Sequence, residues 1–146
     1  MRSLGYRVVR GFLAIAFLIY GIAKLADIQF NRAYQPYAFE DVPLELLSGF
    51  QLTWRFFAYS RVYQCAIGFA EVGAAVLLLS SRTAALGAVA FFPVIVNVVL
   101  VDLCFGIPEG ATVMALSLLG GDLVLLVADR HRLRLALAAL IRPAAE

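Results

Sequence analysis

Four polar residues lie within long apolar stretches of this sequence, namely Lys24, Glu71, Asn97 and Asp122. A charged group surrounded by hydrocarbon is costly, so such residues usually face other helices or a cavity. A lysine can donate hydrogen bonds to an oxygen of a bound molecule, and a carboxyl group can exchange protons with it. If these side chains meet, they form a polar core that holds the head of a lipophilic molecule.

A structural interpretation of the same residues stays open. Lys24 can extend its ammonium group to the nearest aqueous surface, and Glu71 can pair with it simply to hold two helices together. Asp122 follows a glycine pair, which permits close helix contact, so its carboxyl group can serve as a hydrogen-bonding group in packing. Asn97 can join two helices in the same way.

The elements that carry these residues are predicted to be membrane-spanning helices. The chain of 146 residues is 63% hydrophobic and 15% charged, whereas soluble domains are about a quarter charged. Four apolar stretches each approach the roughly 20 residues that cross a bilayer. The fold class is therefore all-α, an integral membrane four-helix bundle in a single domain (1–146). The predicted spans are residues 8–26, 62–79, 84–101 and 111–128.

Depth along these helices brings Lys24 and Glu71 within reach of each other. Glu71 lies about 15 Å below Arg61, near the bilayer midplane, at 1.5 Å per residue. Lys24 is about two turns shallower, and its side chain can point downward. We therefore expect the two to meet, directly or through a ligand or water.

Spacing adds further candidates. Tyr20 shares a helix face with Lys24, and Gln64 shares one with Glu71. The predicted proton-exchanging catalytic residues are Glu71 and Asp122, and the predicted ligand-binding residues are Lys24, Tyr20, Gln64, Asn97 and Trp54.

The segments outside the spans are also predicted to be ordered. Residues 27–61 are rich in aromatic side chains, which favour the membrane–water boundary. They are expected to form an outer cap with a short helix around Leu44–Phe57. The tail (129–146) carries leucines at 133, 137 and 140 with arginines between them, a pattern typical of an amphipathic helix on the cytoplasmic leaflet.

Charge predicts the orientation and excludes some partners. Eight arginines lie before the first span, between the second and third, or after the fourth, whereas three lie on the other side. Positively charged loops stay inside, so both termini are expected in the cytoplasm.

Lys24 and Asp27 close the first span with no cleavage site, so it is not expected to be a signal peptide. The net charge of +2 is too small and scattered for nucleic-acid binding.

The cysteines and the histidine are not expected to form a metal site. His131 lies among arginines, and Cys65 and Cys104 are far apart in the sequence without C-x-x-C spacing. Both cysteines are expected to be reduced, small apolar residues.

Several motifs resemble the DoxX family of bacterial four-helix membrane proteins. They are the first-span run that ends in Gly21-Ile22-Ala23-Lys24-Leu25, then Ala70-Glu71-Val72-Gly73, then Arg82-Thr83-Ala84-Ala85-Leu86-Gly87, with Asn97 and Ile107-Pro108. Where a subtype reads Asn-x-x-Tyr-Asp-Val-Pro, this chain reads Asp102-Leu103-Cys104-Phe105-Gly106-Ile107-Pro108, a departure at the outer turn. The resemblance implies a bacterial inner-membrane location and assigns importance to Lys24 and Glu71.

Two functions follow as expectations. In the first, the chain is a redox-linked membrane subunit that binds a quinone, as the resemblance to a thiosulfate:quinone oxidoreductase subunit implies. It has no intrinsic cofactor motif, so the electrons would have to come from a partner protein. In the second, it is a non-enzymatic assembly or interaction partner whose intramembrane charges are structural. Membrane lipid is expected around either, and a homo-oligomer is compatible with both.

Overall fold

The computed structural model describes residues 3–141, and these form six α-helices and two short 3-10 helices. The predicted all-α fold is confirmed, and four of the helices are long and apolar enough to cross a membrane. At most 33% of the most apolar stretch of each is buried inside the chain, so most of this apolar surface faces outward. The elements are α1 (Leu4–Leu25), η1 (Pro36–Phe39), η2 (Leu44–Leu46), α2 (Gly49–Tyr59), α3 (Arg61–Leu79), α4 (Ala84–Cys104), α5 (Glu109–Ala128) and α6 (Arg130–Ile141).

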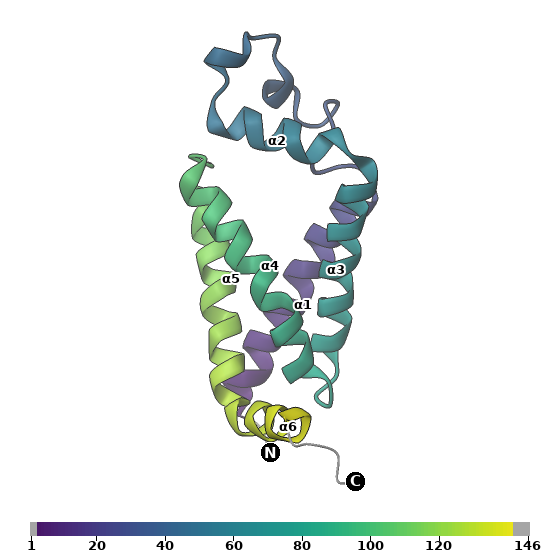
Figure 1. Cartoon of the computed structure of the whole chain (residues 1–146), viewed down its shortest axis with the longest axis vertical. Helices are drawn as coiled ribbons and strands as arrows, with labels where there is room; N and C mark the ends of the chain where they lie inside the picture. The colour runs from purple at the N-terminus through teal and green to yellow at the C-terminus, as the bar shows by residue number, and fades with distance from the viewer. Residues whose placement is uncertain (1–2, 142–146) are drawn as a thin grey trace.

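The four long helices are arranged in two pairs, α1 with α3 and α4 with α5. Figure 1 shows that the pairs converge at the end that carries α6 and diverge toward α2, which lies across the opposite end. The core lies at the converging end, where the Phe17 and Phe91 rings are 3.3 Å apart between centroids. The two pairs therefore form the walls of a space that α2 covers.

Glycines set the closest helix contacts. A Cβ atom at Gly21 on α1 would lie 2.9 Å from the carbonyl oxygen of Gly68 on α3. One at Gly87 on α4 would lie 2.9 Å from the backbone nitrogen of Leu78 on α3. Because only glycine avoids these collisions, α1 packs directly on α3, and α3 packs directly on the first turns of α4.

The outer end of α1 is held by α3. Asp27 has a positive φ of 56°, and Ile28 N–H donates to the Ala23 carbonyl group, a geometry that closes the helix. The Arg61 guanidinium group then donates to the last carbonyl oxygens of the helix, those of Lys24, at 2.6 Å, and Leu25. A cation at a helix C-terminus is favourable, so Arg61 fixes the end of α1 beside the start of α3.

The cap segment, predicted as residues 27–61, ends at Ser60 because α3 begins at Arg61, and it covers the diverging end. The predicted helix around Leu44–Phe57 instead begins at Gly49, because Ser48 and Gln51 form a capping box there and a 3-10 turn precedes it. Arg55 Nε donates to the Ala38 carbonyl oxygen at 3.2 Å, which ties α2 to η1. A Cβ atom at Gly49 would collide with the Phe105 backbone, so the start of α2 lies directly on the α4–α5 turn.

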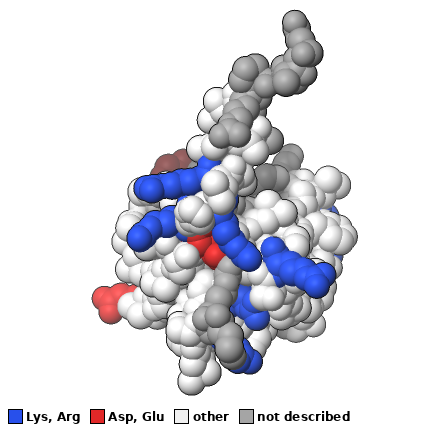
Figure 2. Space-filling view, turned by 90° about the horizontal axis from the view of Figure 1, so that it is seen from below, with Lys and Arg blue, Asp and Glu red and all other residues white. Residues whose placement is uncertain are grey.

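The tail forms α6 at the converging end, lying across the bundle rather than along it (Figure 1). Buried Asp129 accepts a hydrogen bond of 2.6 Å from the Tyr6 hydroxyl group on α1. This bond attaches the chain to α1 just before α6 begins. Figure 2 shows Lys and Arg side chains gathered on this face. Arg2 and residues 142–146 lie outside the described residues.

Candidate functional site

A cavity lies beneath the cap, between the α1–α3 pair and the α4–α5 pair. Its wider lobe measures about 310 Å³ and its narrower lobe about 100 Å³. The two lobes are adjacent, because several residues line both of them. The shared residues are Lys24, Gln29, Trp54, Glu71, Val94, Val98 and Asp102.

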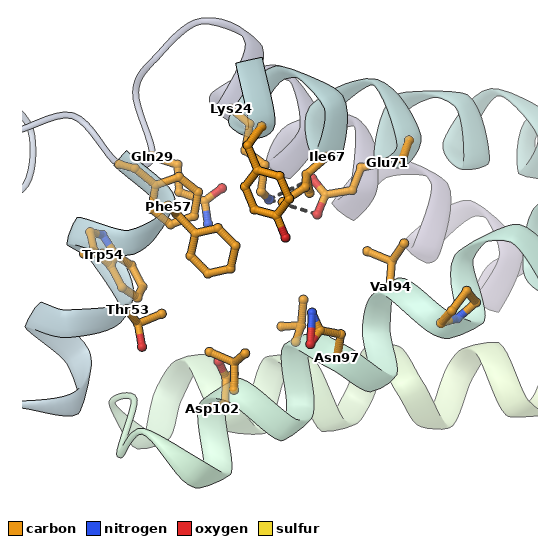
Figure 3. Close-up of a pocket in the computed structure, with 16 residues that line it drawn as sticks. Lys24, Gln29, Thr53, Trp54, Phe57, Ile67, Glu71, Val94, Asn97 and Asp102 are labelled. Atoms are coloured by element: carbon orange, nitrogen blue, oxygen red, sulfur yellow. Dashed lines mark hydrogen bonds and ion pairs between the residues drawn. The ribbon is translucent and has the colours of Figure 1, made fainter. Parts of the chain in front are cut away.

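An ion pair between Lys24 and Glu71 forms one wall of the cavity (Figure 3). Lys24 Nζ lies 2.9 Å from Glu71 Oε1 and 2.8 Å from Oε2. The residues are only 6% and 3% exposed, so neither charge is solvated by bulk water. The expected contact is therefore present, and each group compensates the other's charge.

Several other polar groups of the cavity lack a partner within the described part of the chain. Gln29 Oε1, Thr53 Oγ1 and Trp54 Nε1 are buried without a hydrogen bond. All three residues line the wider lobe, and Figure 3 shows their side chains around the same space. A buried polar atom without a partner costs about 1–3 kcal/mol, so this arrangement favours a bound molecule with matching groups.

The charges of the cavity favour an uncharged ligand. The positive charge of Lys24 and the negative charge of Glu71 cancel. Asp102, which is 9% exposed, adds a second carboxyl group across the cavity. A phosphate-bearing head group would meet two acids and one base that is already paired. A neutral head with both acceptors and donors fits the available groups better.

Aromatic rings from the cap and α3 form the outer wall. Phe30 stacks on Phe57 at 4.9 Å and meets Trp54 edge-on at 5.5 Å. Phe57 in turn stacks on Tyr63 at 6.2 Å. These rings offer flat apolar surface to a planar head group.

The structure brings five of the predicted residues to the cavity: Lys24, Tyr20, Glu71, Asn97 and Trp54. The Lys24 ammonium group is 5.8 Å from the centre of the Tyr20 ring. Asn97 is at the edge, because it is exposed while still lining the wider lobe.

Gln64 and Asp122 do not line either lobe, so the structure does not bring Asp122 together with Lys24, Glu71 and Asn97 as expected. Gln64 is one turn from Gly68, which packs on α1, and therefore is buried on that side of α3. Asp122 lies a turn beyond Leu118, the last of the α5 residues that line the narrower lobe. Gly121 contacts Val9 and Leu13, so this part of α5 packs on the lower half of α1.

Among the cavity residues that were not predicted candidates, three carry an amide, hydroxyl or carboxyl group: Gln29, Thr53 and Asp102. Asp102 has a sequence signal, since it is an acid near the end of an apolar span. Gln29 and Thr53 lie in the cap, and only the fold of the cap over the helices brings them to the cavity. Cys65 is half-buried on α3, and Cys104 is exposed at the end of α4. That both are reduced stays a prediction.

Fold and site together define a helical protein whose four long helices are apolar enough to cross a membrane, with a cavity between them that carries several polar side chains. A protein of Bacillus subtilis (strain 168), the uncharacterized protein YwoB, is 45% identical over 123 residues, which cover 84% of this chain and 75% of YwoB. The chain belongs to the same family as YwoB. No protein-family model matches the sequence, and no solved structure matches it.

Proposed function

We propose that this protein binds a lipophilic molecule of the quinone class in the cavity and acts as the membrane subunit of a redox-linked system of the DoxX type. The observation that carries the proposal is the set of unpartnered polar atoms beside the buried Lys24–Glu71 pair, all within an aromatic-walled space. In this proposal the protein lies in a bacterial inner membrane. The cap is outside, and both termini with the basic tail are in the cytoplasm.

A quinone head matches these groups in both of its redox states. The carbonyl oxygens of the oxidised form accept hydrogen bonds from the Trp54 indole, the Thr53 hydroxyl group and the remaining N–H of Lys24. The hydroxyl groups of the reduced form donate to Gln29 Oε1 and the Asp102 carboxylate. The ring lies against Phe30 and Phe57.

The proton-exchanging role falls to the two carboxyl groups that line the cavity, Glu71 and Asp102. A quinol that loses two electrons also releases two protons, so two nearby acceptors suit this chemistry. A partner protein supplies or accepts the electrons. Asp122 has no part in this proposal, because it lies away from the cavity.

Bound molecules extracted from the purified protein test the proposal. The protein is isolated from its own membrane in mild detergent, extracted with organic solvent and analysed by mass spectrometry. We expect a quinone in about equimolar amount, and its loss from the Lys24→Met/Glu71→Gln double variant. A quinone content no higher than that of an unrelated membrane protein isolated from the same membrane would contradict the proposal.

An assembly or interaction role is the second candidate, and one surface favours it. An apolar groove on the outer side of α2 is lined by Leu44, Leu47, Leu52, Phe56 and Tyr59 among others. Large exposed apolar patches often contact other proteins. A stable partner protein that co-purifies without any quinone, and is lost from a Phe56→Ser/Tyr59→Ser variant, would favour this role.

A further inference from the structure

The wider lobe of the cavity has its exposed lining residues on two helices. Most of its lining residues are buried or half-buried. Those that are exposed are Tyr63 and Ala70 on α3 and Pro93 and Asn97 on α4. The opening therefore lies between α3 and α4, on the side of the molecule away from α1.

The opening follows from the sequence of α4. At Gly87 this helix is in direct contact with α3. Pro93, a turn and a half later, lies inside the helix and has no N–H group to bond the preceding turn, which allows the helix to bend. Toward the end near α2, α4 diverges from α3, as Figure 1 shows.

The surroundings of the opening are apolar and lie at membrane depth. Ala70 is about 14 Å along α3 from Arg61 at 1.5 Å per residue. Phe69 beside it is 66% exposed, and Leu100 on α4 is 55% exposed. Both lie within helices apolar enough to span the membrane, so the opening faces lipid tails rather than water.

We propose that the ligand reaches the cavity sideways from the bilayer through the α3–α4 opening, and that it carries an apolar tail which stays in that opening. The inference rests on the proposed function and specifies its ligand as a long-tailed quinone rather than a water-soluble one. Head-group contacts lie within the cavity, while Ala70 and Pro93 contact the tail. Asn97, at the edge, hydrogen-bonds the head oxygen nearest the tail.

A substitution that narrows the opening tests this route. Ala70→Phe places a ring in the opening, whereas Ala66→Phe places the same ring one turn away on α3, at an exposed position that does not line the cavity. Trp54 is the only tryptophan of the chain and lines both lobes, so its fluorescence reports binding. The protein is reconstituted in lipid nanodiscs and titrated with decyl-benzoquinone and with the tail-less benzoquinone head.

We expect Ala70→Phe to weaken binding of the decyl compound at least about tenfold, since lost burial of two methylene groups suffices for that change. Binding of the tail-less head should change less than about threefold, which also shows that the variant is folded. Ala66→Phe should match the wild type with both compounds.

Three results would overturn the inference. Unchanged decyl-benzoquinone binding in Ala70→Phe, with saturable binding to the wild type, would refute the route and leave the proposed function standing. A loss in Met114→Phe instead would place the route at the narrower lobe, where Met114 on α5 is 39% exposed. Absence of quinone binding to the wild type would reject the proposed function itself.

Discussion

Lys24 and Glu71 show how two costly residues become tolerable at one point of the fold. Each side chain is nearly inaccessible to solvent. Among the described residues, the oppositely charged group that each contacts is the other member of the pair, at hydrogen-bond distance. Two of the three Lys24 N–H groups are directed at Glu71, so one remains for another acceptor. The pair is thus both a helix-to-helix contact and a hydrogen-bonding group of the cavity.

A double-mutant cycle on this pair measures their interaction. Lys24→Met leaves a buried carboxyl group alone, and Glu71→Gln leaves a buried ammonium group alone. Each should lower the free energy of unfolding in detergent by about 3 kcal/mol, and the double variant should lose about 1 kcal/mol, because no charge remains unpaired. Strictly additive losses in thermal unfolding would show that the residues do not interact.

Asp122 is the opposite case, a buried acid without a countercharge. It is fully buried, and neither carboxyl oxygen has a hydrogen-bond partner in residues 3–141. Asp122→Leu keeps the size and removes the unpaired polar atoms, so it should stabilise the protein by about 1–2 kcal/mol. Thermal unfolding checks this, with Leu118→Asp as the reverse change. A clear loss of stability in Asp122→Leu would mean that the carboxyl group makes a favourable interaction.

The ion pair could be predicted from the sequence, but most of the site could not. Depth along two helices follows from residue counts, so Lys24 and Glu71 could be placed near each other. Gln64 does not line the cavity, because two residues that share a helix face over two turns need not have the same neighbours where helices cross. Thr53 had no signal, since its position depends on how the cap folds.

At the scale of helices, glycines determine which surfaces meet. Gly21→Ala should lower the free energy of unfolding by about 1–3 kcal/mol, because its methyl group would press on Val72 and on the Gly68 carbonyl oxygen at 2.8 and 2.9 Å. Gly11→Ala on the same helix has no atom within 4 Å and is the matched control. Thermal unfolding of both in detergent checks this. Equal behaviour of the two variants would contradict close packing of α1 on α3.

The helices themselves were largely predictable, because an apolar run of about 20 residues has few alternatives in lipid. The exact ends of the helices were less predictable. α1 begins at Leu4 rather than Val8, since Ser3 caps it, and α4 continues through Asp102 to Cys104 because the cavity accommodates that acid. In the cap, Ser48 and Gln51 set the start of α2 by local hydrogen bonds, a Ser-x-x-Gln pattern that the sequence itself contains.

For the whole molecule, the two ends differ in charge. The described part of the end with α6 carries arginines at 7, 10, 82, 130, 132 and 134. At the cap end, Arg32, Arg55 and Arg61 are outnumbered by the acids at 27, 40, 41, 45 and 109. Basic loops are retained in the cytoplasm, which supports an inward-facing tail.

Reporter fusions test this orientation. Fusions to the N-terminus, to the C-terminus and at Glu45 in the cap are compared, using one reporter active only in the cytoplasm and one active only outside. We expect both termini to give the cytoplasmic signal and the cap to give the external one. An external signal from either terminus would reverse the proposed topology.

Quinone binding to the cavity around Lys24 and Glu71 is the central claim, and Trp54 fluorescence measures it most directly. Decyl-benzoquinone added to the wild type in nanodiscs should quench Trp54 in a saturable way. The Lys24→Met/Glu71→Gln double variant should bind at least about tenfold more weakly, whereas Tyr6→Phe, at the far end of the bundle, should bind like the wild type. Quenching without saturation, or equal affinity in all three proteins, would contradict the account.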